Sequence, residues 1–204
     1  MHIAIEGNIG AGKTTLGKLL SERFQTRLVL EDFSDNPFLP SFYKEPARFA
    51  FPLEMSFMAQ RFMQWRDSMD PDMFKPDVIS DYHFEKSILF ASHTMDPDVF
   101  PVFRRLALQL SRSLKRPDVL VYLRSSTDAL LEKIQQRGRE YEQGISSDYL
   151  ERIELSYSNW LKQQRSMGIL DLRIREKYIT DNWSLDALWE EIQGVAKAGV
   201  YRQY

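Results

Sequence analysis

A glycine-rich segment near the N-terminus has the residue types and the spacing that bind a nucleoside triphosphate. Residues 7–14 read Gly-Asn-Ile-Gly-Ala-Gly-Lys-Thr and match the pattern G-x-x-x-x-G-K-[ST] in full. The glycines let the loop curl, so that backbone N–H groups point at phosphate oxygens. We expect Lys13 to reach the β and γ phosphates and the Thr14 hydroxyl to ligate Mg²⁺. The predicted ATP-binding residues are Gly7, Asn8, Ile9, Gly10, Ala11, Gly12, Lys13, Thr14 and Thr15.

Two acidic side chains follow short apolar runs, in positions where phosphate chemistry needs a metal ligand and a base. Asp81 ends the run that begins at Asp77, and P-loop proteins hold Mg²⁺ with a carboxylate at the tip of a buried strand. The alternative is an acid that caps the next helix. Glu31 follows residues 27–30, where a carboxylate would face the γ-phosphate and could take a proton from an attacking hydroxyl. The alternative there is a solvated acid in a turn.

A basic loop follows a predicted helix in the second half of the chain. Residues 137–139 read Arg-Gly-Arg. Arg137 and Arg139, on a glycine-hinged loop, can close over a triphosphate and neutralise the charge that develops in the transition state. A basic helix C-terminus that offsets the helix dipole would contain the same residues, so both interpretations stay open. The N-K-x-D tetrad with which GTPases read guanine does not occur in the sequence, which argues against a switch protein.

Alternating strand and helix patterns must position these residues. We predict strands at residues 2–6, 27–30, 77–81, 118–123 and 169–174, and helices at residues 14–24, 53–69, 84–92, 101–114, 149–164 and 185–196. Four prolines limit residues 34–52 to turns and short helical pieces. The pattern Ser125-x-x-Asp128 predicts the cap of a helix that ends at Arg137. This alternation indicates an α/β fold, a parallel sheet with helices on both faces, which binds ligands at the carboxyl ends of its strands.

Length and composition limit the kind of protein and its partners. The chain has 204 residues, enough for one α/β domain and too few for two ordinary domains. Hydrophobic residues make up 43% and charged residues 27%, as in globular proteins. A net charge of −2 argues against a nucleic-acid partner, which usually requires a basic surface.

Cysteine and histidine usage limits the chemistry further. The chain has no cysteine, which excludes disulfides, thiolate zinc sites and cysteine catalysis. Its three histidines lack the spacing of metal ligands. The N-terminus has no basic region followed by a long apolar segment, and no run approaches the roughly 20 apolar residues of a membrane span. We therefore expect a soluble cytoplasmic protein without a membrane partner.

In their order along the chain, these motifs resemble the deoxynucleoside kinase family, which contains the deoxycytidine, deoxyguanosine and deoxyadenosine kinases. The resemblance covers residues 1–165. Its most specific part is Arg137-Gly-Arg-Glu-Tyr-Glu-Gln-Gly-Ile145, followed by Tyr149-Leu150 and Tyr157-x-x-Trp160, which is similar to the family lid and the helix after it. Residues 36–51 resemble the substrate-side insertion of the family. The resemblance implies a P-loop kinase with three α/β/α layers, a five-stranded parallel sheet and an arginine lid, as one domain over residues 1–204.

The resemblance also implies roles for individual residues around the sugar and the base. Glu31 would be the general base for the deoxyribose 5′-hydroxyl, and Arg61 would lie near that hydroxyl and the phosphates. Tyr43 and Glu142 would hold the 3′-hydroxyl, and Phe90 would stack on the base. The predicted catalytic residues are Glu31, Lys13, Arg137 and Arg139.

One helical stretch, residues 49–65, is rich in methionine and aromatic residues, as a core segment would be. We expect only Glu54, Met58 and Arg61 to face the pocket, at helical spacing. Glu54 stands where the family usually has a base-reading glutamine. An ionised carboxylate only accepts hydrogen bonds, which suits an amine on adenine, cytosine or guanine and disfavours thymine. Resemblance to relatives of this size favours purine deoxynucleosides, with deoxyadenosine first.

The chain departs from the family at two more positions. The family usually has an acid-Arg-Ser motif after the third strand, whereas this chain reads Asp81-Tyr82-His83. Our hypothesis is that Arg61 or Lys86 supplies the charge of the missing arginine. Lys86 also replaces an acid with which the family reads the base.

These observations predict a kinase of nucleotide salvage that uses ATP and Mg²⁺ to phosphorylate a small-molecule deoxynucleoside at its 5′-hydroxyl. The resemblance implies a homodimer. One alternative is a nucleoside monophosphate kinase of the thymidylate kinase kind, against which the acidic Glu31 argues, because an acceptor phosphate would lie there. Another is a P-loop module that binds ATP and turns over slowly.

Overall fold

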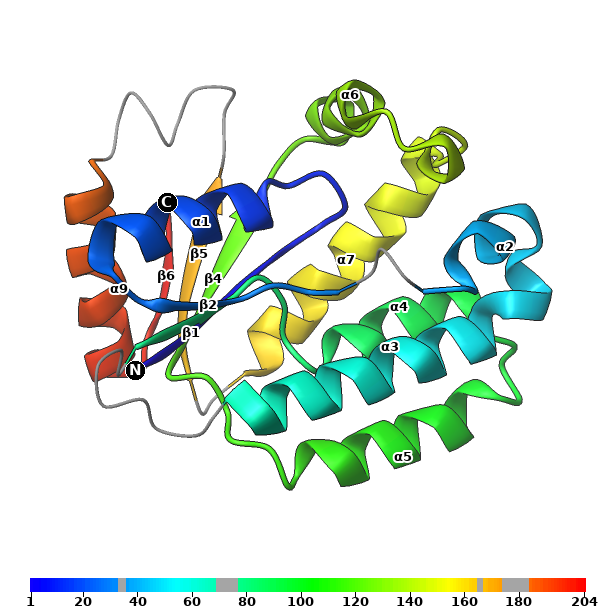
Figure 1. Ribbon diagram of the computed structural model, residues 1–204, viewed down its shortest axis with the longest axis horizontal. Coiled ribbons are helices and arrows are strands. Elements are labelled where there is room, and N and C mark those ends of the chain that lie inside the picture. Colours follow the sequence, from blue (N-terminus) through cyan, green and yellow to red (C-terminus); the bar gives the residue numbers. More distant parts are fainter. Residues whose placement is uncertain (33–35, 69–76, 165–166, 174–183) are drawn as a thin grey trace.

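The protein is described from a computed structural model, which covers residues 1–32, 36–68, 77–164, 167–173 and 184–204. Strands and helices alternate along most of this length (Figure 1). In chain order the described elements are β1 (His2–Gly7), α1 (Lys13–Phe24), β2 (Arg27–Val29), α2 (Leu39–Lys44), α3 (Pro46–Ser68), β3 (Val78–Ser80), α4 (Lys86–Thr94), α5 (Phe100–Ser111), β4 (Val119–Arg124), α6 (Thr127–Arg137), the 3₁₀ turn η1 (Glu140–Glu142), α7 (Ser147–Gln163), β5 (Gly168–Arg173), α9 (Leu185–Ala198) and β6 (Tyr201–Gln203).

Within the described part of the chain, six strands form one parallel sheet in the order β2-β3-β1-β4-β5-β6. The α/β class, the parallel sheet and the helices on both faces are confirmed, but the prediction of five strands is wrong. The sixth strand, β6, has only three residues, all of them exposed. It pairs with β5 through backbone hydrogen bonds such as that from the Ile169 N–H to the Val200 carbonyl. An exposed strand this short has no apolar pattern by which the sequence could reveal it.

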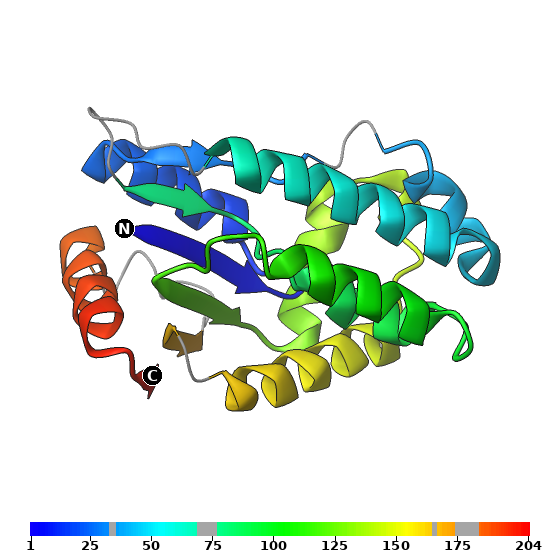
Figure 2. The same cartoon turned by 90° about the horizontal axis from the view of Figure 1, so that it is seen from below.

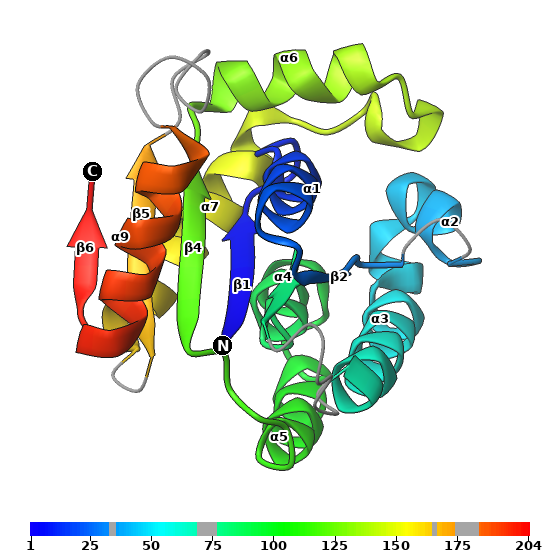
Figure 3. The same cartoon turned by 60° about the vertical axis from the view of Figure 1, so that its left-hand side comes forward.

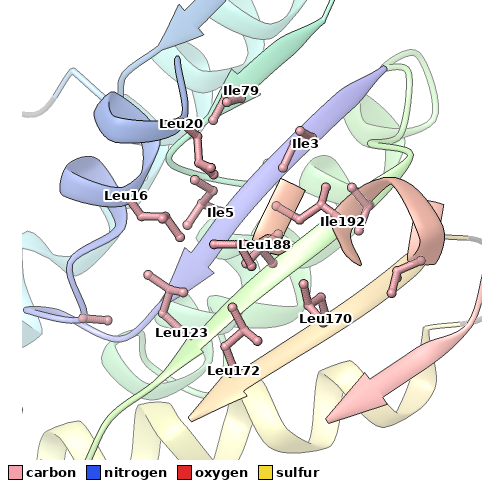
Figure 4. Packing of buried hydrophobic residues seen from close by; sticks show 14 of the residues in the cluster. Ile3, Ile5, Leu16, Leu20, Ile79, Leu123, Leu170, Leu172, Leu188 and Ile192 are labelled. Carbon is pink, nitrogen blue, oxygen red and sulfur yellow. The ribbon is translucent and has the colours of Figure 1, made fainter. Parts of the chain in front are cut away.

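One face of the sheet is covered by α1 and α9, which enclose the larger apolar core (Figure 4). Ile3 and Ile5 of β1 point toward Leu16 and Leu20 of α1. Leu188 and Ile192 of α9 cover β4 and β5 in the same way. Since these residues are almost all fully buried, this core fixes the position of β1 and of the glycine-rich loop that follows it.

The other face of the sheet packs against α4 and α7, and a second group of helices lies beyond α4. Leu120 and Tyr122 of β4 contact Ile153, Tyr157 and other side chains of α7 in a separate core cluster. Helices α3 and α5 pack on α4 and lie side by side in Figure 2, with a third apolar cluster between them. None of the helices in the described ranges combines the length and the apolar character needed to cross a membrane.

The proline-rich segment differs from its prediction. Residues 39–44 form the short helix α2, as expected of a turn-rich segment, but α3 already begins at Pro46 and continues through Pro52. Proline fits the first turn of a helix, because the N–H it lacks would have no partner there. Pro52 lies inside the helix, where proline is unfavourable by about 3 kcal/mol. The buried residues Ala50, Leu53 and Phe57 keep this part helical through packing, which the local sequence cannot reveal.

The helix before the arginine loop begins one residue later than its cap pattern suggested. The N-cap of α6 is Ser126, whose hydroxyl accepts a hydrogen bond from the Ala129 N–H, and not Ser125. Helix α6 then ends at Arg137 as predicted. It lies across the end of the sheet toward which β1 and β4 point (Figure 3). The predicted strand at residues 169–174 is confirmed as β5 up to residue 173; its last residue, like the last residue of the predicted helix 53–69, falls outside the described ranges.

Candidate active site

A cavity at the carboxyl edge of the sheet brings most of the predicted site residues together. Its walls come from the glycine-rich loop, the ends of β2 and β3, helices α2, α3 and α4, and the segment around η1. The predicted site residues in these walls are Ile9, Gly10, Lys13, Thr14, Glu31, Tyr43, Glu54, Arg61, Asp81, Phe90, Arg137, Arg139 and Glu142. An adjoining cavity, also lined by Lys13 and Thr14, adds Gly12 and Thr15.

The glycine-rich loop curls tightly between β1 and α1. Gly10 and Gly12 have φ values of 83° and 91°, which favour glycine. Lys13 Nζ donates hydrogen bonds to the carbonyls of Gly7 and Asn8, each at 2.9 Å, so its charge lies over the curl of the loop. Asn8 ties the loop to α7 through a 2.8 Å bond from Nδ2 to the Leu150 carbonyl. Gly7, Asn8 and Ala11 therefore shape the loop, as the motif predicts for phosphate binding.

Asp81, just after β3, joins the loop to the end of β2. One of its carboxylate oxygens accepts a hydrogen bond from the Thr14 hydroxyl, and the other accepts from the Glu31 backbone N–H at 2.6 Å. A hydroxyl and a carboxylate next to a phosphate loop are the oxygen ligands that Mg²⁺ takes, along with water and phosphate. Thr14 and Asp81 therefore fit the predicted metal ion.

Two cations hold the Glu31 carboxylate. Arg61 donates from Nε at 2.8 Å and from Nη2 at 2.5 Å to Oε1, and Lys86 Nζ donates to Oε2 at 2.5 Å. Arg61 also donates to the Ser87 hydroxyl, and its side chain is 4% exposed. Glu31 is almost as buried, at 11%. This ion-paired cluster fixes the carboxylate beside Asp81, at the mouth of the phosphate loop.

The two cations also determine the protonation of Glu31. Burial alone would raise the pKa of this carboxyl group, but its attraction to Lys86 and Arg61 outweighs burial and holds the pKa well below its usual range. Attraction to Glu31 in turn raises the pKa of Arg61 against the effect of burial. Burial lowers the pKa of Lys13 to about 8, and the nearby charge of Lys86 adds to this effect.

Glu54, on α3, also lines the cavity. Unlike the carboxylate of Glu31, its carboxyl group is not held by cations within the described ranges. It is 4% exposed, and its Oε2 has no hydrogen-bond partner among the described residues. Burial raises its pKa to about 7, although Arg61 and Lys86 oppose this and only Glu31 adds to it. Apolar and aromatic residues line the same cavity, including Leu53, Phe57 and Phe90. A flat, largely apolar ligand with a few polar edge atoms fits this part of the cavity.

The arginine loop closes the other side of the cavity. Arg137 Nη2 and Arg139 Nη1 each bind one oxygen of Glu142, at 2.5 and 3.1 Å. Glu142 belongs to η1 and is 5% exposed. The Tyr43 ring lies 5.8 Å from that of Tyr141, and burial together with the charge of Glu142 raises the Tyr43 pKa. The predicted sugar-binding pair, Tyr43 and Glu142, is thus brought together with both lid arginines.

The cavity lining and the predicted site differ, among other residues, at Met58, Tyr149 and Lys86. Met58 is buried in the apolar cluster formed by α3, α4 and α5 and does not line the cavity, so its role stays a prediction. Tyr149, at the start of α7, lines the cavity but was not predicted as a site residue. Lys86 was considered as a replacement charge and as the residue in place of a base-reading acid, but not as a partner of Glu31, which it contacts directly. No local pattern indicated this contact, because it spans 55 residues of sequence.

The residue in place of the family arginine does not reach the site. Tyr82 is fully buried, and its ring lies 5.7 Å from that of Trp65. Its hydroxyl has no hydrogen-bond partner in the described part of the chain, and burial raises its pKa. Arg61 and Lys86 both bind the Glu31 carboxylate, which is consistent with the hypothesis that one of them supplies the missing charge.

Comparison with protein families gives a match over nearly the whole chain. The family model described as deoxynucleoside kinase matches residues 3–197. The deoxyguanosine kinase of Bacillus subtilis is 38% identical over 79% of this chain and 78% of its own length. A deoxyadenosine/deoxycytidine kinase of the same organism is 29% identical over 95% and 92%, and the deoxyadenosine kinase of Dictyostelium discoideum is 32% identical over 97% and 78%.

Solved structures share the fold. Deoxyadenosine kinase from M. mycoides, described with the products dCMP and dCDP, superposes with a TM-score of 0.77 at 21% identity, covering 97% of this chain and all of that one. The same enzyme with bound dATP gives a TM-score of 0.70 at 23% identity, over 80% and 84%. At such identities the likeness supports the fold, and the sequence relatives carry the family assignment.

Proposed function

Because the chain belongs to the deoxynucleoside kinase family, we propose that it transfers the γ-phosphoryl group of ATP to the 5′-hydroxyl of a purine deoxynucleoside, with deoxyadenosine first. The observation that carries this proposal is the Glu31 carboxylate, held by Arg61 and Lys86 next to the phosphate loop. The acceptor in this position is a hydroxyl rather than a phosphate, because a phosphate beside Glu31 would meet a negative charge.

Glu31 is the acceptor of the 5′-hydroxyl proton in this mechanism. Its two cationic partners keep it ionised, so that it can orient the hydroxyl throughout the reaction. A carboxylate with a low pKa is a weak base. That suits phosphoryl transfer through a loose transition state, in which the attacking hydroxyl needs positioning more than early deprotonation. Tyr43 and Glu142 hold the 3′-hydroxyl in the same pose.

The charge on the transferring group is balanced by residues of the loop and the lid. Lys13 contacts the β and γ phosphates, and Arg137 and Arg139 turn from Glu142 toward the triphosphate. Thr14 and Asp81 would hold Mg²⁺, which neutralises charge on the β and γ phosphates when bound. Asp81 has a second role, because its contact with the Glu31 backbone fixes the distance between the donor and acceptor halves of the site.

The preference for purines rests on the relatives and on the pocket around Glu54. The relatives reported above are named for deoxyguanosine, deoxyadenosine and, in one case, deoxycytidine. Phe90 lines the cavity from α4 and provides an aromatic face on which a base can stack. Glu54 lies in the same cavity with an unpaired oxygen, which is suited to a base amine.

We also propose a cytoplasmic homodimer made by helix packing. Three apolar side chains on the outer surfaces of α5 and α7 are exposed, namely Val102, Leu106 and Leu155. Helix faces of this kind are commonly buried between subunits. Sedimentation of the purified protein would give twice the mass of the chain if the proposal is correct.

The experiment that tests the activity is ADP production with Mg²⁺-ATP against a panel of acceptors. The panel contains the four deoxynucleosides, their ribose forms and thymidine monophosphate. We expect ADP release to depend on a deoxynucleoside, with the purines used best. Activity only with the monophosphate would identify a nucleoside monophosphate kinase, and ADP release without any acceptor would identify a slow ATP-binding module.

A further inference from the structure

Glu54 is a buried carboxyl group that the proposed reaction does not use for chemistry. The side chain is only 4% exposed, yet no residue in the described part of the chain forms a hydrogen bond with Oε2. A polar atom buried without a partner is unfavourable by about 1–3 kcal/mol, so such an atom in a ligand cavity is normally satisfied by the ligand. Glu54 shares this cavity with Glu31 and Phe90, where the proposed 5′-hydroxyl and base would lie.

The two protonation states of a carboxyl group recognise different base edges. A neutral carboxyl group donates one hydrogen bond and accepts another, whereas a carboxylate only accepts. Adenine presents one donor, the N6 amine, beside one acceptor, either N1 or N7. Guanine presents two adjacent donors, N1–H and the N2 amine. Against a carboxylate, adenine would leave one oxygen facing a nitrogen lone pair, while guanine would satisfy both oxygens.

We propose that the protonation state of Glu54 selects between the two purines, with the neutral carboxyl group pairing with adenine and the carboxylate pairing with guanine. This inference rests on the proposed function, because it names how the same site reads its substrate. The neutral state also accepts guanine through O6 and N1–H. The expected pattern is therefore use of both purines, with deoxyadenosine first, when Glu54 is protonated, and guanine selectivity when it is ionised.

The surroundings of Glu54 place its change of protonation state near neutral pH. Burial raises its pKa to about 7, opposed by Arg61 and Lys86. The other ionisable groups that face it are Glu31 beyond β2, Tyr149 on α7 and, across the cavity, Tyr43 on α2. The pKa of Glu31 is lowered and the pKa values of both tyrosines are raised, so these three groups keep their charge in this range.

The test is the ratio of kcat/KM for deoxyguanosine to kcat/KM for deoxyadenosine, measured from about pH 5.5 to about pH 8.5. We expect the ratio to rise by roughly 10- to 100-fold with pH, the discrimination typical of a bidentate base contact. Taking a ratio cancels groups that act on both substrates alike, such as Lys13. The matched control is Glu54→Gln, whose amide always offers one donor and one acceptor, so its ratio should stay constant.

A second measurement needs no catalysis. Calorimetry of nucleoside binding near pH 7, in buffers of different ionisation enthalpy, counts the protons exchanged. The wild-type protein should take up protons with deoxyadenosine and take up none with deoxyguanosine, and Glu54→Gln should take up none with either. A ratio that is constant in the wild type, or that changes equally in Glu54→Gln, overturns this inference but leaves the kinase activity intact. Failure to phosphorylate any deoxynucleoside would instead overturn the proposed function.

Discussion

At the scale of single residues, the site depends on two glutamates in opposite environments. Glu31 is bound by two cations and stays ionised, while Glu54 is buried with one oxygen unpaired and titrates near neutrality. The sequence indicated both residues as candidates. It could not indicate their environments, because the contacts of Glu31 with Arg61 and Lys86 span 30 and 55 residues. Spacing patterns describe neighbours along one element, and these partners meet only after α3 and α4 have packed.

Replacing Lys86 by alanine should affect Glu31 in a defined direction. Without this cation the pKa of Glu31 rises toward its usual range, and turnover then falls as the pH decreases toward that value. We also expect kcat to drop on the order of 10²-fold, since a charge that positions the reacting carboxylate is lost. The measurement is kcat from about pH 5 to about pH 8. Lys86→Arg, which keeps the charge, is the control, and an alanine variant with wild-type turnover would show that Lys86 does not act on Glu31.

The raised pKa of Glu54 predicts a pH-dependent stability. Between the usual value of 4.5 and about 7 the folded state binds a proton that the unfolded state has lost. The free energy of unfolding therefore decreases as the pH rises through this window, by at most about 3 kcal/mol. Glu54→Gln lacks this loss, so its advantage over the wild type should grow between about pH 5 and about pH 8 in urea unfolding. An equal difference at both pH values would contradict a raised pKa.

At the scale of elements, the phosphate loop is in direct contact with α6, the helix that leads into the arginine loop. A Cβ atom on Gly10 would lie 3.0 Å from the Leu130 carbonyl and 3.2 Å from Ile134 Cγ1, both on α6. Both the glycine-rich loop and a helix ending at Arg137 were predicted from the sequence, but their contact with each other was not. The start of α3 at Pro46 was also missed, because packing overrides the unfavourable Pro52 inside this helix. The predicted cap of α6 was Ser125, whereas the structure has Ser126.

We expect Gly10→Ala to impair ATP binding through this contact. Its φ of 83° disfavours any side chain, and the added methyl group would push α6 away from the loop. The two effects together should weaken ATP affinity by about tenfold, which corresponds to about 1.4 kcal/mol. Titration with ATP measures this. Gly144→Ala is the control, because a Cβ there meets no atom within 4 Å and its affinity should equal that of the wild type.

At the scale of the whole molecule, a buried ion pair joins the last three strands of the sheet. Asp171 of β5 is fully buried and accepts two hydrogen bonds from Arg124 of β4, at 3.2 and 2.9 Å. It also accepts one from the Tyr201 hydroxyl of β6 at 2.6 Å. Strand β6 could not be predicted from the sequence, since neither its length nor its polarity marks a strand. Its place in the sheet follows from Asp171 and from backbone pairing with β5.

Asp171→Ala should therefore destabilise the fold. Among the described residues, it leaves the Arg124 guanidinium with Glu154 alone as its anionic partner. Breaking one side of a buried pair typically lowers the free energy of unfolding by about 3–5 kcal/mol. Tyr201→Phe removes a single hydrogen bond and should lower it by about 1 kcal/mol. Urea unfolding of both variants measures the difference. Equal losses would mean that the ion pair contributes no more than the hydroxyl.

The Glu142 carboxylate has consequences for how the two substrates affect each other. Its two oxygens are occupied by Arg137 and Arg139, yet the proposed reaction needs the arginines on ATP and the glutamate on the sugar. Each substrate would thus release the group that the other requires. Such thermodynamic coupling is reciprocal, so ATP and the nucleoside should strengthen each other's binding by the same factor. A nucleoside analogue without a 3′-hydroxyl would lose this synergy together with one hydrogen bond.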